Sequence, residues 1–220
     1  MIQLRNVSKI YPNGSHSLSG VNLDLMRGGF LFITGVSGAG KSTLLKLLYG
    51  EEQPDSGEVI VDGCDVTKLR GDRLSLFRRH IGVVFQDYKL IPRRTVAENI
   101  AFVLRSQAVE RKEIQRRLIP TLKLVGLQHK ADCFPEQLSG GEQQRISLAR
   151  AIVGTPPLIL ADEPTGNLDF DNAIQVFKIL KKLNSYGATV ILSTHDQRLV
   201  KISNYPVAQL RNGRLFEVRN

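Results

Sequence analysis

The stretch from Gly35 to Thr43 reads G-V-S-G-A-G-K-S-T and contains the phosphate-binding pattern G-x-x-x-x-G-K-[ST]. This pattern constrains the fold because it acts only between a strand and a helix. The apolar run Phe30 to Thr34 precedes it, and Ser42 to Tyr49 follows it with helix-forming residues and leucines that favour a buried side. The sequence therefore predicts an α/β protein that binds a nucleotide.

Each position of this loop has an expected role in phosphate binding. Its glycines allow tight turns that bring backbone N–H groups close to phosphate oxygens, and the start of the helix adds a positive dipole end. Lys41 is expected to contact the β- and γ-phosphates, Ser42 to ligate a bridging Mg2+ and Thr43 to lie near the α-phosphate. The expected backbone cradle consists of Gly35, Ser37, Gly38, Ala39 and Gly40. The competing interpretation, an ordinary glycine-rich turn, is disfavoured by the matching strand and helix on either side.

Composition indicates a globular protein. The chain has 220 residues, 42% of them hydrophobic, which is enough for one large domain or a domain with a subdomain. No apolar run approaches the roughly 18 residues of a membrane span, and the N-terminal stretch lacks the apolar centre of a signal peptide, so a cytoplasmic location is expected. Cys64 and Cys133 are isolated in the sequence and are expected to be packing residues rather than zinc ligands or disulfide partners.

The positive charge is concentrated in the middle of the chain. The formal net charge is +9, and Arg70 to Arg117 contains 12 basic and 5 acidic residues. This segment lacks the interleaved aromatic residues of a nucleic-acid stacking platform, so no nucleic-acid partner is expected. An anionic membrane surface remains a possible neighbour, and a solvated basic helix face without a partner remains the alternative.

The elements around the loop predict two kinds of structure. Met1 to Val7 and Val21 to Leu25 favour antiparallel strands joined by a turn at Pro12-Asn13-Gly14. Tyr88 to Phe134 is helical in pattern and contains a capping box at Thr95. The remaining expected helices are Arg70 to Arg79, Lys112 to Val125, Leu138 to Val153 and Asp171 to Ser185, and the remaining expected strands are Glu58 to Asp62, Ile81 to Phe85, Leu158 to Ala161, Ala188 to Ser193, Val207 to Leu210 and Arg214 to Val218.

Two carboxylates follow an apolar strand at Leu158 to Ala161, in a Walker B arrangement. Ligands collect at the carboxyl ends of strands in α/β sheets. Asp162 is therefore expected to hold the Mg2+ shell, and Glu163 to orient and deprotonate an attacking water. A capped strand end would explain one carboxylate but not two.

A second anion site is predicted at Leu138 to Gln144, which reads L-S-G-G-E-Q-Q. Ser139, Gly140 and Gly141 offer a hydroxyl and backbone N–H groups at a helix start. One chain needs a single γ-phosphate cradle, so a second one indicates two copies paired head to tail. With L-S-G-G-E-Q-Q as the signature, the whole chain resembles an ATP-binding-cassette ATPase subunit.

The resemblance implies a P-loop NTPase fold of the ATP-binding-cassette type, with a RecA-like core, an antiparallel β-subdomain and a helical subdomain. It implies that residues 1–86 and 158–220 form the core with the β-subdomain, that residues 87–157 form the helical part, and that ATP and Mg2+ are bound by a homodimer. By similarity, Tyr11 stacks on adenine, Gln86 contacts Mg2+ and the attacking water, Asp169 belongs to the D-loop, and His195 bonds the γ-phosphate. Glu163, His195, Gln86 and Lys41 are then the expected catalytic residues.

Within the family, the stretch Ile81 to Ala101 most resembles the cell-division group, and its segment Gln86-Asp87-Tyr88-Lys89-Leu90 leans toward that group. Such a protein would lie on the cytoplasmic side of the plasma membrane with a membrane protein of the FtsX type. The helical insertion offers apolar residues for docking, although several of them are expected to pack its own core: Leu90, Ile91, Ile100, Phe102, Val103 and Leu104. Lipoprotein-releasing and macrolide-export ATPases share its core motifs and are the alternative. Only about ninety residues separate the phosphate loop from the signature, too few for the coiled coil of a DNA-repair relative. A module that binds ATP without hydrolysis would be expected to lack Glu163 or His195.

Overall fold

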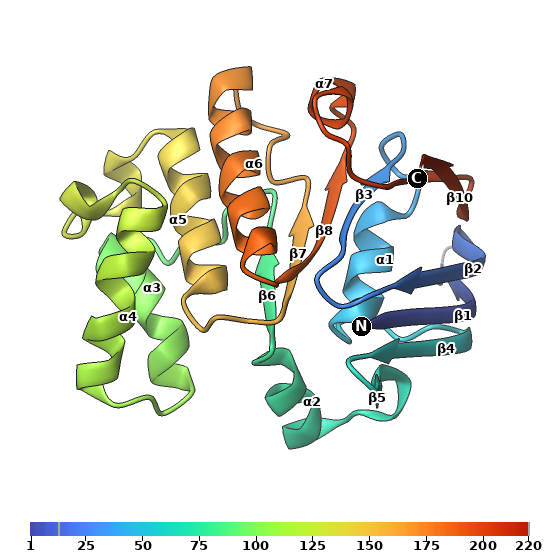
Figure 1. Ribbon diagram of the computed structural model, residues 1–220. Coiled ribbons are helices and arrows are strands. Elements are labelled where there is room, and N and C mark those ends of the chain that lie inside the picture. The colour runs from blue at the N-terminus through green and yellow to red at the C-terminus, as the bar shows by residue number, and fades with distance from the viewer. Residues whose placement is uncertain (13, 220) are drawn as a thin grey trace.

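The computed structural model describes residues 1–12 and 14–219, which form two sheets with helices around them (Figure 1). The larger sheet has the strand order β10-β9-β3-β8-β7-β6. Its strands are β3 (Phe30–Thr34), β6 (Ile81–Val84), β7 (Leu158–Asp162), β8 (Thr189–Thr194), β9 (Val207–Arg211) and β10 (Arg214–Arg219). All neighbours are parallel except β9 and β10, which form the expected hairpin around Asn212 and Gly213.

The parallel strands of the larger sheet have their carboxyl ends on the same side, and this arrangement positions the site. β3 is fully buried, and β8 is buried along its whole length, as expected for strands covered on both faces. Because β3, β6, β7 and β8 run in the same direction, the segments that follow Thr34, Val84, Asp162 and Thr194 emerge side by side. These segments contain the phosphate loop, Gln86, Glu163 and His195.

The smaller sheet is antiparallel with the order β2-β1-β4-β5. Its strands are β1 (Ile2–Ile10), β2 (His16–Leu25), β4 (Ser56–Val61) and β5 (Cys64–Asp65). The antiparallel pairing of the first two strands is as the alternating sequence predicts. Asn13, the centre of the predicted turn, lies outside the described residues.

Helix α1 (Lys41–Leu48) lies between the two sheets. Leu44 and Leu48 have no exposed surface and pack with Leu4 of the smaller sheet and Ile33 of the larger one in a single apolar cluster. This packing holds the helix rigidly behind the phosphate loop. On the other face of the larger sheet, α5 (Gly140–Ile152) and α6 (Phe170–Ser185) contribute to a second apolar cluster.

A helical lobe stands beside the edge of the larger sheet that carries β6 (Figure 1). It consists of α3 (Val96–Ser106), α4 (Arg111–Leu124) and α5. The Thr95 capping box is present at the start of α3, as the sequence predicts. The other helices are α2 (Gly71–Arg78), α7 (Gln197–Lys201) and short 3-10 turns at Val66–Lys68, Gln128–Lys130 and Pro135–Gln137. None of the helices formed by residues 1–12 and 14–219 has the length and apolar character of a membrane span.

Of the six apolar residues considered for docking, Ile100 and Leu104 have no exposed surface and belong to the core of the lobe, as expected for part of the set. Their face of α3 points inward because it packs against α5, whereas Phe102 on the other face is 40% exposed. Cys64 is exposed rather than a packing residue, because it lies on the two-residue strand β5 at the sheet edge.

Candidate active site

The phosphate loop connects β3 to α1 and depends on its glycines. Gly40 has a φ of 104°, in the left-handed region, and caps the helix start. A Cβ atom at this position would lie 2.3 Å from the backbone oxygen of Ser17 on β2. No other residue fits there, because both the backbone conformation and the close approach of β2 require glycine.

Two neighbouring cavities lie at the carboxyl ends of the strands of the larger sheet. One of about 600 Å³ is lined by the loop and by three residues from other strand ends, Gln86, Glu163 and His195. The other, of about 740 Å³, contains Asp162 and shares Ser42 and Gln86 with the first. The loop residues that line the first cavity are Val36, Ser37, Gly38, Gly40, Lys41, Ser42 and Thr43. The fold thus gathers residues that are more than 150 positions apart in the chain.

Gly35 and Ala39 are not among the residues that line these cavities. The backbone oxygen of Gly35 accepts a hydrogen bond from Lys41, and the Ala39 side chain is buried in the apolar cluster below the loop. These two residues shape the loop from behind, and the bonds they would make to phosphate remain a prediction.

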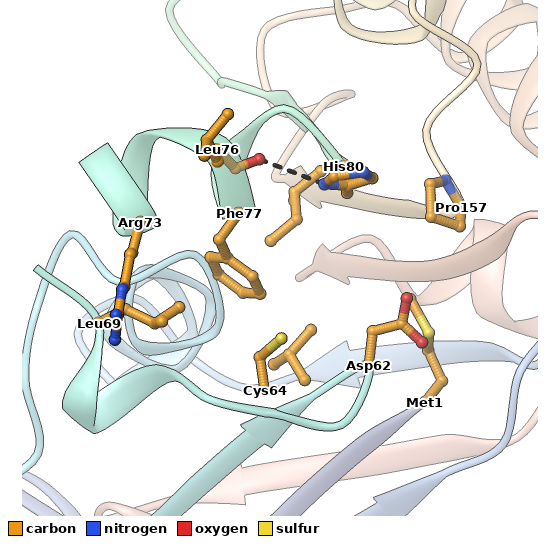
Figure 2. Close-up of a pocket in the computed structure, with 11 residues that line it drawn as sticks. Met1, Asp62, Cys64, Leu69, Arg73, Leu76, Phe77, His80 and Pro157 are labelled. Atoms are coloured by element: carbon orange, nitrogen blue, oxygen red, sulfur yellow. Dashed lines mark hydrogen bonds between the residues drawn. The ribbon is translucent and has the colours of Figure 1, made fainter. Parts of the chain in front are cut away.

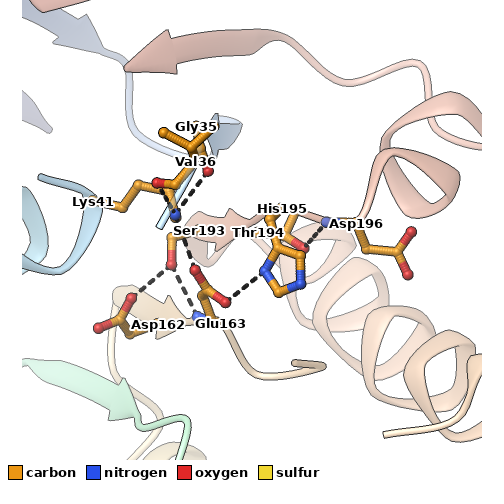
Figure 3. A network of polar contacts seen from close by, with 9 residues as sticks. All are labelled: Gly35, Val36, Lys41, Asp162, Glu163, Ser193, Thr194, His195 and Asp196. Atoms are coloured by element: carbon orange, nitrogen blue, oxygen red, sulfur yellow. Dashed lines mark hydrogen bonds and ion pairs between the residues drawn. The ribbon is translucent and has the colours of Figure 1, made fainter. Parts of the chain in front are cut away.

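Lys41 is the centre of a polar network (Figure 3). Its side chain is 4% exposed, and its ammonium donates to the backbone oxygens of Gly35 at 2.8 Å and Val36 at 3.1 Å. The same nitrogen lies 3.0 Å from Oε1 of Glu163. The other oxygen, Oε2, lies 2.7 Å from Nδ1 of His195. A buried ammonium with three acceptors is satisfied.

The environment of Glu163 favours its ionised form. Burial raises the pKa of this carboxyl, but Lys41 and His195 oppose burial and bring the pKa below its ordinary value. The carboxylate is therefore ionised near neutral pH and is able to accept a proton. Its backbone has a φ of 43°, in the region that non-glycine residues seldom adopt and that is associated with functional sites.

Asp162 and Ser42 offer oxygen atoms beside this carboxylate. Both line the second cavity with Gln86, and hydroxyl, amide and carboxylate oxygens are the ligand types that Mg2+ prefers. Oδ1 of Asp162 accepts a hydrogen bond of 2.7 Å from Ser193. Among the described residues Oδ2 has no hydrogen-bond partner and is available as a ligand. The donor set therefore fits a magnesium ion.

Tyr11 lies next to the loop, where the sequence predicts adenine stacking. Its hydroxyl is 3.2 Å from the Thr43 hydroxyl, and Ser17 donates to the same Thr43 oxygen at 2.8 Å. Ser17 also lines the first cavity, although the sequence does not single it out. A lone serine in a strand carries no spacing signal, and only the approach of β2 to the loop reveals it.

The signature residues lie elsewhere in the chain. Ser139 caps α5, where it accepts from the Glu142 backbone N–H while the Glu142 side chain accepts from the Ser139 N–H. Ser139, Gly140, Gly141 and Asp169 are absent from the residues that line either phosphate-loop cavity. The single chain therefore does not bring the second anion cradle to the first.

The signature and the D-loop are joined to each other. Asp169 caps α6 by accepting from the Asn172 N–H at 2.9 Å and from its side-chain amide at 2.7 Å. Asn172 accepts from Arg145 of α5 at 3.1 Å, and a Cβ at Gly141 would lie 2.4 Å from its oxygen. These contacts tie the starts of both helices into one surface.

A third cavity, of about 390 Å³, lies beside α2, away from this network (Figure 2). It is mainly apolar, with Phe77 and Leu76 on one side and Met1 on the other (Figure 2). None of the sequence-predicted site residues lines it. Its lining offers no cluster of groups suited to phosphate chemistry.

The sequence pattern of the ABC transporter family matches residues 18–166. The chain is 46% identical to the cell division ATP-binding protein FtsE of Streptococcus pneumoniae, over 98% of this chain and 94% of that protein. It is 44% identical to the proteins of the same name from Bacillus subtilis, over 97% and 93% of the two chains, and Escherichia coli, over 98% and 97%.

Solved structures show the same likeness in three dimensions. The ATP-binding cassette MJ0796, solved as a dimer in a post-hydrolysis state bound to ADP and Pi, superimposes with a TM-score of 0.91. The two proteins are 38% identical, and the match covers 100% of both chains. The chain therefore belongs to the ABC transporter family, as an ATPase cassette similar to the cell-division protein FtsE.

Proposed function

We propose that this chain is a Mg2+-dependent ATPase in which Glu163 is the general base. The observation that carries the proposal is the position of Glu163 between Lys41 and His195 at the mouth of the phosphate loop. When ATP binds, its phosphates replace Glu163 as the partner of Lys41. The released carboxylate then accepts a proton from the attacking water, and His195 bonds the γ-phosphate.

Three residues would hold magnesium: Ser42 through its hydroxyl, Gln86 through its amide oxygen, and Asp162 through Oδ2. The bound ion would neutralise charge that develops on the phosphate oxygens. Gln86 also lies close to Glu163, and Gly166 lies against both side chains. A Cβ atom added to Gly166 would be 3.4 Å from the side-chain nitrogen of Gln86 and 3.5 Å from Oε2 of Glu163. This position suits a side chain that orients the water.

Hydrolysis is proposed to require two copies paired head to tail. Ser139, Gly140, Gly141 and Asp169 would face the nucleotide held on the partner's phosphate loop. Their absence from both cavities of their own chain supports this arrangement. The dimeric form of MJ0796 supports it independently.

The cassette is proposed to act with a membrane protein of the FtsX type, on the cytoplasmic face of the membrane, to control cell-wall hydrolysis. The names of the FtsE relatives support the division role. Phe102 of the helical insertion is 40% exposed, and Leu90 is half-buried. These apolar side chains would receive a short amphipathic segment of the partner.

The substitution Glu163→Gln tests the catalytic assignment. The carboxamide keeps the shape of the side chain but cannot accept the proton, so steady-state ATP hydrolysis should fall at least about a hundredfold. Binding of a fluorescent ATP analogue should remain within about threefold of wild type, because the loop is unchanged. Hydrolysis at the wild-type rate would remove Glu163 from the mechanism.

A further inference from the structure

Ser193 is a polar residue within the buried strand β8. It has no exposed surface, and it follows Val190, Ile191 and Leu192, which are buried apolar residues. In the parallel register of β7 and β8 it stands opposite Asp162. A hydroxyl placed in such a core requires hydrogen-bond partners, and its partners here are the two residues of the Walker B pair.

The hydroxyl makes two bonds at the same time. It donates to Oδ1 of Asp162 at 2.7 Å and accepts from the backbone N–H of Glu163 at 2.9 Å (Figure 3). A serine hydroxyl has one proton and two lone pairs, so both bonds are satisfied without competition. The Glu163 N–H is shared between this hydroxyl and the backbone oxygen of Ser193, which lies 3.1 Å from the same nitrogen.

These bonds fix two separate properties of the site. The bond to Oδ1 orients the Asp162 carboxylate and leaves Oδ2 without a hydrogen-bond partner among the described residues. The bond from the Glu163 N–H supports a residue whose φ of 43° is unfavourable for a side chain. Groups that hydrogen-bond a metal-binding carboxylate orient it and tune its affinity for the metal.

We propose that Ser193 is a positioning residue that sets the geometry of both Walker B carboxylates. It is fully buried and lines neither phosphate-loop cavity, so it acts through Asp162 and Glu163 rather than on the nucleotide. The proposal rests on the assignment of Asp162 to the magnesium shell given above.

The test uses Ser193→Ala in the full-length chain. The kcat for ATP hydrolysis should fall about tenfold or more, as expected for loss of one hydrogen bond to a charged group, while the KM for ATP changes less than twofold. The Mg2+ concentration for half-maximal activity should rise. Ser193→Thr keeps the hydroxyl on a side chain suited to a strand and should restore both values.

A binding measurement separates positioning from a general effect on folding. In the Glu163→Gln background, calorimetry gives the ATP affinity with Mg2+ and with a chelator. Ser193→Ala should reduce the gain in ATP affinity that Mg2+ provides by about tenfold and leave the metal-free affinity unchanged. Ser147→Ala is the matched control, because Ser147 is equally buried but its hydroxyl has no hydrogen-bond partner among the described residues.

The outcomes distinguish this inference from the proposed function. If Ser193→Ala leaves kcat and the Mg2+ effect within twofold of wild type while Asp162→Asn abolishes the Mg2+ effect, the role of Ser193 is wrong and that of Asp162 stands. If Asp162→Asn also leaves the Mg2+ effect intact, the magnesium assignment itself fails. If the alanine variant does not fold, Ser193→Cys provides the test. Its thiol is a weaker donor than the hydroxyl, so an intermediate loss of activity is expected.

Discussion

Lys41 and Glu163 form an ion pair inside the protein rather than on its surface. Their side chains are 4% and 15% exposed, so solvent screens the attraction only weakly. The pKa of Glu163 lies below its ordinary value of 4.5 in the folded chain. The pair therefore stabilises the fold at pH values above that ordinary value, and this contribution is lost as the pH falls through the lowered pKa.

Replacement of Lys41 by alanine should change the pKa of Glu163. Burial is the largest influence on this carboxyl and raises its pKa, whereas Lys41 is the main influence that lowers it. Without Lys41 the pKa should rise, which carbon-detected NMR titration of the carboxyl measures. Lys46→Ala is the control, since Lys46 pairs with Glu51 and should leave the Glu163 titration in place. An unchanged or lower pKa in Lys41→Ala would contradict the network.

The contributions of the ring and the hydroxyl of Tyr11 to ATP binding can be measured separately. Stacking on a base is worth about 1–3 kcal/mol, so Tyr11→Ala should weaken ATP binding about tenfold or more. Tyr11→Phe keeps the ring and loses only the contact with Thr43, so its affinity should stay within about threefold of wild type. Fluorescence titration with ATP measures both, with Tyr186→Ala as a control at an exposed position. Equal losses in Tyr11→Ala and Tyr11→Phe would assign the role to the hydroxyl.

At the level of elements, α3 and α5 begin with the same capping box but differ in expected role. Thr95 and Ser139 each accept from the backbone of a glutamate three residues later, and each glutamate side chain bonds back. Loss of either cap should cost about 1 kcal/mol of folding stability. Only the cap of α5 is proposed to face the partner's nucleotide.

This difference gives a matched pair of variants. Thr95→Ala and Ser139→Ala should lower the unfolding temperature by similar amounts in a thermal melt. Ser139→Ala should also reduce ATP hydrolysis, by about tenfold for one lost bond to phosphate, whereas Thr95→Ala should not. If both variants lose activity equally, the effect of Ser139 is structural and the signature is not a nucleotide contact.

Most elements could be predicted from the sequence, because their local signals agree with their tertiary positions. β3 has the predicted bounds Phe30 to Thr34, and the Thr95 cap starts α3 where the capping box indicates. The helix α7 is absent from the sequence prediction, since it has only five residues and little periodicity. Its cap, Asp196, accepts from the Arg198 N–H and is the signal that could have located it.

The site could be predicted as far as its motifs extend. Lys41, Glu163 and His195 each belong to a recognisable pattern, and the structure brings them into one network. Ser193 carries no pattern, because a serine in a strand gains its role only from the register between β7 and β8. The inward and outward faces of α3 depend on how the lobe packs, which periodicity alone leaves open.

At the scale of the whole molecule, the proposed docking on a membrane partner can be tested separately. Phe102 is 40% exposed and stacks with Arg94, whose guanidinium carbon is 4.6 Å from the ring centre, and Leu90 is half-buried nearby in the chain. Phe102→Glu and Leu90→Asp should release the chain from membranes that contain an FtsX-type protein, because apolar contact is lost while ATP binding persists. Co-sedimentation with membranes measures the release.

The control for docking is Ile202→Glu, which alters an exposed apolar side chain after α7. It should leave membrane retention unchanged. Retention of the wild-type chain on membranes from cells without the FtsX-type protein would show that recruitment does not depend on that partner.

The composite site made by two copies is the central claim, and mixing two inactive variants tests it most directly. Lys41→Ala has a defective phosphate loop and an intact signature, whereas Ser139→Arg has the reverse. In a mixed dimer, one site combines the intact loop with the intact signature.

An equal mixture should therefore hydrolyse ATP clearly faster than either variant alone. A mixture of Ser139→Arg with the double variant Lys41→Ala/Ser139→Arg should stay inactive. If the first mixture also stays at the background rate while mixed dimers are present, the two-chain site is contradicted.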